Sequence, residues 1–217
     1  MAKKVMFRRF LMFIFSLLFM GIGVAFTKHS NLGVSPISSV ANVLSLRFTL
    51  LSIGVWITIT SCVLVLGQII VLQKNFPIKQ LLQIPLSFLF GICTDFGLWL
   101  ICYIPNDQYI VQLLLLICGV VLLGLGIVLG IFADVMMNSG EAFVKVISDT
   151  TKIGFGYIKI AFDVLWVLFA VCLSLLFFNG KIYGVREGTI ISAILVGIIV
   201  KAFQTILKKP LTCFLSK

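Results

Sequence analysis

The 217 residues include 61% hydrophobic and only 11% charged side chains, which excludes an ordinary water-soluble domain. The formal net charge of +10 would suit a nucleic-acid-binding protein, but the basic residues lie at the breaks between apolar segments and do not form one cluster. We therefore expect a membrane protein that binds no nucleic acid.

Six apolar stretches are each long enough for a helix to cross a hydrocarbon core of about 30 Å. None shows the alternation of apolar and polar residues that membrane β-strands require, so the expected fold class is all-α. The whole chain, 1–217, is expected to form one polytopic transmembrane helix bundle. The expected spans are residues 10–27, 50–72, 81–104, 110–133, 157–178 and 188–207.

The first span follows a basic start, a pattern that also describes a cleavable signal peptide. We favour a retained span because the residues after it belong to a pattern that recurs later in the chain. Of the basic residues outside the spans, four lie on one expected side, namely Lys28, Arg47, Lys181 and Arg186. The other side holds the remainder, namely Lys3, Lys4, Arg8, Arg9, Lys74, Lys79, Lys145, Lys152, Lys208, Lys209 and Lys217. The positive-inside rule then predicts a cell-membrane protein with both termini in the cytoplasm.

A polar elbow and a short amphipathic helix are predicted after the first span. Asn31 marks the elbow, Ser35 is the expected N-cap, and Pro36 suits the first helical turn because its missing N–H is not needed there. Such a helix either enters the membrane partway or lies flat at the interface as a connector.

Asp95 is the clearest charged residue inside a span. It lies well inside the predicted third span, where a charge costs at least about 2.5 kcal/mol on insertion scales. Two explanations remain open: a protonatable or cation-pairing group in a polar cavity, or a buried structural contact.

A second elbow and short helix follow the fourth span. Asp134 marks the elbow, Asn138 is the expected N-cap, and Glu141 lies three residues further on. These features recur 103 residues after their counterparts Asn31 and Ser35. The two copies predict an inverted repeat of three spans each, covering residues 8–105 and 108–210, as in many secondary transporters. Chance similarity between apolar helices is the alternative.

The fifth and sixth spans contain three further charged residues. Lys159 and Asp163 are spaced i, i+4 in the fifth span, so we expect them to pair on one helix face. Lys201 in the sixth span either reaches toward the cytoplasm or neutralises an acid across the bundle.

No enzyme motif is present, and the only histidine, His29, lies in a predicted loop. We expect neither an enzyme nor a protein with a cofactor or metal. The six cysteines show no C-x-x-C spacing and are interpreted as small packing residues.

The stretch G-I-G-V-A-F-T-K-H-S-N-L-G-V-S-P-I resembles the YczE/YyaS/YitT group of bacterial multispan membrane proteins. The segments I-K-I-A-F-D-V-L-W and G-T-I-I-S-A-I-L-V-G, near the end of the chain, extend the resemblance over nearly its whole length. The resemblance implies a multispan architecture and a cell-membrane location, and it leaves the activity open.

These observations favour a secondary transporter or permease for a small polar or anionic solute that works by alternating access. The candidate binding or coupling residues are Asn31, Ser35, Asp95, Asp134, Asn138, Glu141, Lys159, Asp163 and Lys201. The alternatives are a substrate-capture subunit of an energy-coupled uptake system and a non-transporting membrane scaffold or assembly factor. Besides the lipid bilayer and an unknown small-molecule substrate, a homo-oligomer or a partner membrane protein is compatible with the sequence.

Overall fold

A computed structural model describes residues 2–216, and all regular structure in that range is helical. Lys217 lies outside this range, and the side chains of Lys3, Lys4, Lys209 and Cys213 lie outside the described ones. The helices are α1 (Ala2–His29), α2 (Pro36–Arg47), α3 (Ile53–Leu72), α4 (Gln83–Ile101), α5 (Tyr109–Ala133), α6 (Ser139–Thr151), α7 (Phe155–Phe177) and α8 (Glu187–Ser216), with two 3₁₀ turns, Gln73–Asn75 and Ile78–Leu82, between α3 and α4.

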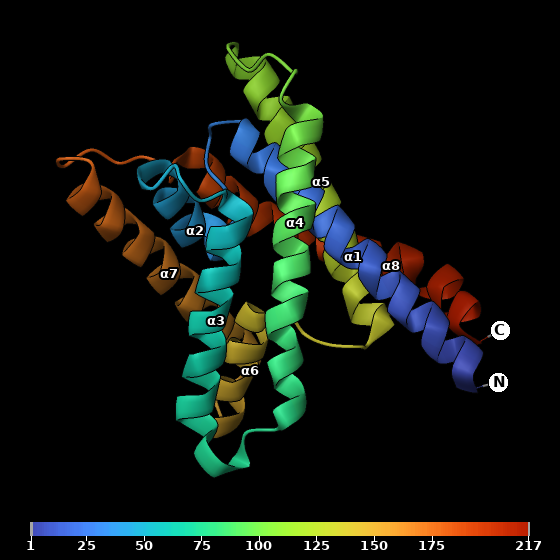
Figure 1. Ribbon diagram of the computed structural model, residues 1–217. Helices are drawn as coiled ribbons and strands as arrows, with labels where there is room; N and C mark the ends of the chain where they lie inside the picture. The colour runs from blue at the N-terminus through green and yellow to red at the C-terminus, as the bar shows by residue number, and fades with distance from the viewer. Residues whose placement is uncertain (1, 217) are drawn as a thin grey trace.

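Six of these helices, α1, α3, α4, α5, α7 and α8, are long and apolar enough to cross a membrane. The six predicted spans are therefore confirmed, and the chain is a multi-pass membrane protein. The predicted limits differ by a few residues; α3, for example, begins at Ile53 because the Ser52 hydroxyl accepts a hydrogen bond from Val55 N–H as its N-cap. The chain alternates direction, so α1 begins and α8 ends on the same side of the bundle (Figure 1).

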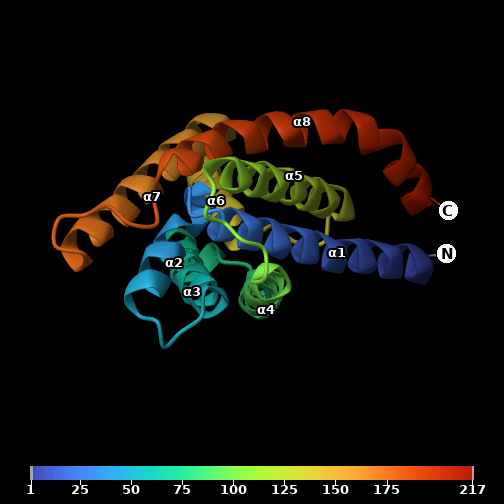
Figure 2. The same ribbon diagram turned by 90° about the horizontal axis from the view of Figure 1, so that it is seen from above.

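The helices pack in two groups. In one, α1 packs against both α4 and α5, and α5 also packs against α8. In the other, α2 contacts α7, α3 contacts α6, and the pairs α2–α3 and α6–α7 are also in contact. Extensive packing of α3 on α4 joins the two groups, whereas α7 and α8 diverge from the loop between them (Figures 1 and 2).

Glycines set the close crossings between the long helices. A Cβ atom at Gly23 of α1 would lie 2.7 Å from the Gly119 carbonyl oxygen of α5. A Cβ at Gly54 of α3 would overlap the Gly91 carbonyl oxygen of α4. These contacts agree with the expectation that small residues let membrane helices approach closely.

The two short helices begin where the sequence predicts, at Pro36 and Ser139, with Ser35 and Asn138 as their N-caps. Their first turns meet, because the Ile37 side chain of α2 packs directly against Gly140 of α6. The Trp166 indole N–H, from the middle of α7, donates to the Ile37 carbonyl at 3.0 Å. Since α2 is buried on its apolar and its polar faces, it does not lie flat on the surface of the bundle.

Candidate functional site

The described residues enclose a cavity of about 680 Å³ between α1, α4, α5 and α6. Phe13, Leu17 and Phe90 form apolar walls near the middle of α1 and α4, and the hydroxyls of Ser16 and Ser87 lie among them. Asn75 and Pro77 also line it, and the segment between α3 and α4 that contains them lies on the side of the bundle where α1 begins (Figure 1). The cavity therefore extends from that side into the core of the bundle.

The second elbow and α6 supply most of the polar lining. Asp134, Asn138 and Glu141, all predicted as site residues, line this cavity together. Lys145 and Asp149 lie one and two turns beyond Glu141 on the same face of α6 and are exposed. The face that the sequence marks as polar is therefore turned into the cavity.

Glu141 lies in the first turn of α6 and is only partly accessible from the cavity. Burial raises the pKa of its carboxyl group, the Lys159 ammonium opposes that rise, and the Asp163 carboxylate adds to it. The described residues give this carboxyl group no hydrogen-bond partner. The neutral acid is therefore favoured over a wider pH range than for an ordinary glutamate.

The start of α6 is tied to α3 and α4 by two glutamines that sequence reasoning missed. Gln68 and Gln83 are buried and exchange amide hydrogen bonds of 3.0 and 3.3 Å. Gln68 also donates to the Ser139 carbonyl at 3.2 Å. Gln68 is the only amide in the apolar run Ile53–Leu72, and this single amide is the signal in the sequence that marks the contact.

Replacing Gln68 with leucine leaves the buried Gln83 amide without its partner. We expect the free energy of unfolding to fall by about 1–3 kcal/mol, which is the usual cost of a buried unsatisfied polar group. Thermal unfolding of purified protein in detergent measures the effect. The double variant Gln68→Leu/Gln83→Leu is expected to recover part of the loss; a loss equal to the sum of the two single effects would contradict this explanation.

Asp134 is exposed at the elbow, where its backbone adopts a left-handed conformation with φ 50°. Its carboxylate lies 3.4 Å from the Arg9 guanidinium of α1. An exposed pair of this kind contributes little stability. It does hold the elbow beside α1 at the edge of the cavity.

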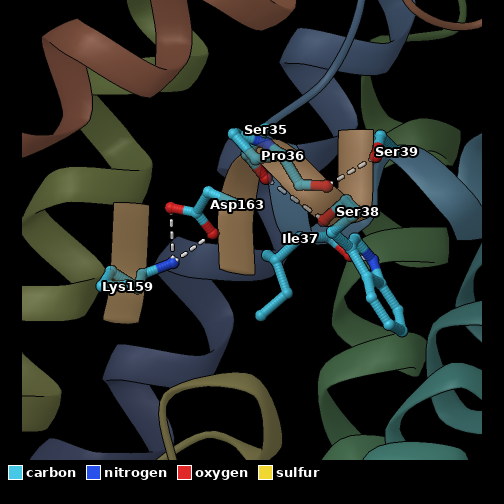
Figure 3. A network of polar contacts seen from close by, with 8 residues as sticks. Ser35, Pro36, Ile37, Ser38, Ser39, Lys159 and Asp163 are labelled. Carbon is cyan, nitrogen blue, oxygen red and sulfur yellow. Dashed lines mark hydrogen bonds and ion pairs between the residues drawn. The ribbon is translucent and has the colours of Figure 1, made fainter. Parts of the chain in front are cut away.

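The predicted pairing within α7 is confirmed. The Lys159 ammonium contacts both carboxylate oxygens of Asp163, at 2.5 and 2.8 Å. Figure 3 shows this pair beside the first turn of α2, residues Ser35–Ser39. Neither residue lines the cavity, although both influence the pKa of Glu141.

Asp95 lies away from the cavity, beside the start of α3. Its carboxylate accepts hydrogen bonds from the Ser52 hydroxyl at 2.5 Å and from the Gly54 N–H at 3.0 Å. These bonds satisfy donors at a helix N-terminus, where a negative charge is favourable. The geometry therefore supports the structural explanation of Asp95 as a cap for α3.

The first elbow is closed. Ser35 is buried, and its hydroxyl donates to Ser38 at 3.2 Å, so it caps α2 without a side-chain bond to the helix backbone. The Asn31 carbonyl accepts from Arg186 at 3.3 Å, which ties the elbow to the residue before α8. Lys201 is exposed on α8 and is not part of the cavity lining.

Six long apolar helices, with a partly polar cavity between α1, α4, α5 and the short helix α6, define a multi-pass helical membrane protein with an internal cavity. Within the part of the chain that the structure describes, no three His, Cys, Asp or Glu residues are grouped closely enough to hold a metal ion.

The chain belongs to DUF6198, a family of unknown function, whose sequence profile matches residues 7–205. It is also 29% identical over 205 residues to a Bacillus subtilis (strain 168) protein described as "Uncharacterized protein YyaS", and this match covers 93% of each chain. The predicted family resemblance is thereby confirmed. No solved structure matches the chain.

Proposed function

We propose that this protein is a secondary transporter for a small polar solute, located in the cell membrane with both termini in the cytoplasm. Transport would proceed by alternating access, in which two inverted three-span units exchange conformations around a central site. The basic residues concentrated on the side of the termini support this orientation.

Landmarks that recur 103 residues apart support the inverted repeat. Asn31 and Asp134 both adopt the left-handed conformation that is uncommon for residues other than glycine, with φ 57° and 50°. The short helices α2 and α6 begin at Pro36 and Ser139, also 103 residues apart. The packing of α1 on α4 corresponds to that of α5 on α8, and the packing of α2 on α7 corresponds to that of α3 on α6.

The observation that carries the proposal is that the two matched elbows are packed differently. In the first elbow, residues 32–35 are all buried, and the Leu32 carbonyl accepts a hydrogen bond of 2.8 Å from Gly188 N–H at the start of α8. In the second elbow, residues 135–138 all remain at least partly accessible, and they line the cavity. In this proposal the three-span unit that contains the first elbow is closed, and the unit that contains the second elbow is open to the cavity.

Gly33 shows how tightly the first elbow is held. Its φ of +115° lies in the region that favours glycine, and a Cβ atom there would overlap the Thr189 hydroxyl oxygen of α8.

In the opposite state, the second elbow would pack against the start of α4 while the first elbow would separate from α8. The cavity would then open on the side away from the termini.

The lining favours a neutral or cationic polar solute over an anion. Three acidic side chains, Asp134, Glu141 and Asp149, line the cavity with one basic side chain, Lys145. Asp134 is already paired with Arg9 and the neutral form of Glu141 is favoured, so Asp149 and Lys145 balance each other and the lining keeps no net positive charge to attract an anion. Neutral hydroxyls and amides, such as those of Ser16, Ser87 and Gln83, would bind polar groups deeper in the cavity.

Reconstituted vesicles test this proposal with a panel of radiolabelled small polar solutes. We expect accumulation of at least one neutral or cationic solute without ATP, and Ser87→Leu, which fills the cavity wall, should reduce its uptake at least tenfold. Phe88→Leu, on the exposed face of the same helix, is the control. Uptake that needs ATP and a co-purifying partner would indicate the substrate-capture subunit, and no uptake under any condition would favour the scaffold.

A further inference from the structure

Glu141 lines the cavity but has no partner of its own. Its carboxyl group takes part in no hydrogen bond and no ion pair among the described residues, although it is partly buried. A buried carboxylate without a partner is costly, so such a group is ordinarily neutral or is bound to a cation. The site therefore has the form of an acid that can accept a proton.

The charged and polar groups around Glu141 come from α7, α6, α3, α4 and the second elbow. From α7, Lys159 and Asp163 act on it electrostatically. On α6 itself, Lys145 and Asp149 extend toward the mouth of the cavity and are exposed. From α3 and α4 the neighbouring polar groups are the neutral amides of Gln68 and Gln83, which are hydrogen-bonded to each other; at the elbow, Asp134 is paired with Arg9.

Lys159 is thus a partly exposed cation that acts electrostatically on Glu141, and in this structure its ammonium group pairs with both carboxylate oxygens of Asp163. If Glu141 loses its proton to water in the cavity, its carboxylate competes with Asp163 for the same ammonium group. An ion pair within α7 is then replaced, in part, by one that joins α6 to α7. No other atom or electron is transferred.

We propose that Glu141 is the proton-binding site of the cavity, and that its protonation state decides whether Lys159 pairs within α7 or across to α6. This inference deepens the proposed transport function, on which its coupling role rests. Protonation of Glu141 itself can be measured without any transport.

Trp166 provides a local probe for the measurement. Its ring stacks on Phe162 with a centroid distance of 5.3 Å, and the Phe162 ring centroid lies 5.9 Å from the Lys159 ammonium nitrogen. A displacement of Lys159 therefore changes the surroundings of the indole. In a Trp56→Phe/Trp99→Phe background, Trp166 is the single tryptophan.

The experiment is a fluorescence titration of this purified single-tryptophan protein in detergent between about pH 4 and pH 9. We expect one transition with a midpoint above the ordinary glutamate pKa of about 4.3, and its loss in Glu141→Gln. Asp149→Asn, an exposed acid on the same face of α6, should keep the transition. A transition that persists in Glu141→Gln, or no transition in the parent protein, would overturn the proposal.

A second variant tests the shared lysine even if Glu141→Gln does not fold. Asp163→Asn frees Lys159 to pair with Glu141, so the midpoint should fall by about one pH unit or more. An unchanged or higher midpoint would contradict the proposal. If the fluorescence transition is intact but the protein transports no solute, only the proposed transport function is overturned. If the protein transports solute but shows no transition, only the proposed role of Glu141 is overturned.

Discussion

Replacing Gly23 with leucine is expected to prevent assembly of the bundle. A Cβ atom at this position would lie 2.7 Å from the Gly119 carbonyl oxygen and 2.7 Å from the Leu123 backbone nitrogen. Backbone atoms of a helix cannot rotate away, so α1 and α5 would have to separate along their extensive contact. Overpacking of a core lowers the free energy of unfolding by about 1–3 kcal/mol. Because the neighbours of Gly23 are rigid backbone atoms, we expect a loss at or above the upper end of this range.

Size-exclusion chromatography and thermal unfolding of detergent-solubilised protein measure this loss. Gly197→Leu is the matched control, because Gly197 lies in a long helix, α8, and nothing is within 4 Å of the added Cβ. We expect Gly197→Leu to behave like the unchanged protein and Gly23→Leu to elute as aggregate. Equal stability of the two variants would show that the α1–α5 crossing is not as close as described.

Linking the first elbow to α8 by a disulfide is expected to stop transport completely and reversibly. A Cβ atom at Gly188 would lie 2.9 Å from the Leu32 Cβ, so a small adjustment brings the pair Leu32→Cys/Gly188→Cys to the separation of about 3.5–4.5 Å found in disulfides. The bond would hold one unit closed. Uptake into vesicles should disappear on oxidation and return on reduction, in a background without the native cysteines.

The pair at the corresponding positions of the second proposed repeat is the control for this experiment. Ile84 is the second residue of α4, as Gly188 is of α8, and Val135 follows Asp134 as Leu32 follows Asn31. Because the second elbow is open, Val135→Cys/Ile84→Cys should cross-link slowly without solute and faster during transport. Full activity of the oxidised Leu32→Cys/Gly188→Cys protein would exclude alternating access through these elbows.

Much of the fold is predictable because it depends on local properties. Apolar length alone defines the six spans, and a capping residue followed by proline defines the start of α2. The i, i+4 spacing of Lys159 and Asp163 likewise predicts their pairing, since one helix sets their distance. None of these inferences requires knowledge of which helices touch.

The role of Asp95 was not decided by the sequence because it depends on the register of two helices. The close contact of Gly54 with Gly91 places α4 so that Asp95 lies level with the first turn of α3, where it accepts from Ser52 and Gly54. Counting residues along one span cannot reveal this alignment. Gln68 and Gln83 escaped notice for the same reason: their significance comes from facing each other across α3 and α4.

The divergence of α7 and α8 has a consequence for the surrounding bilayer. Only 6% of the spanning part of α8 is buried by protein, and α7 is 17% buried, which leaves the wedge between them accessible to acyl chains. In the proposed cycle the wedge between α7 and α8 would close while the corresponding contact between α3 and α4 opens. Lipid in the closing wedge would be displaced into the bilayer. Exchange between the two states would then depend on membrane fluidity, with tightly ordered lipids slowing the protein before any solute is bound.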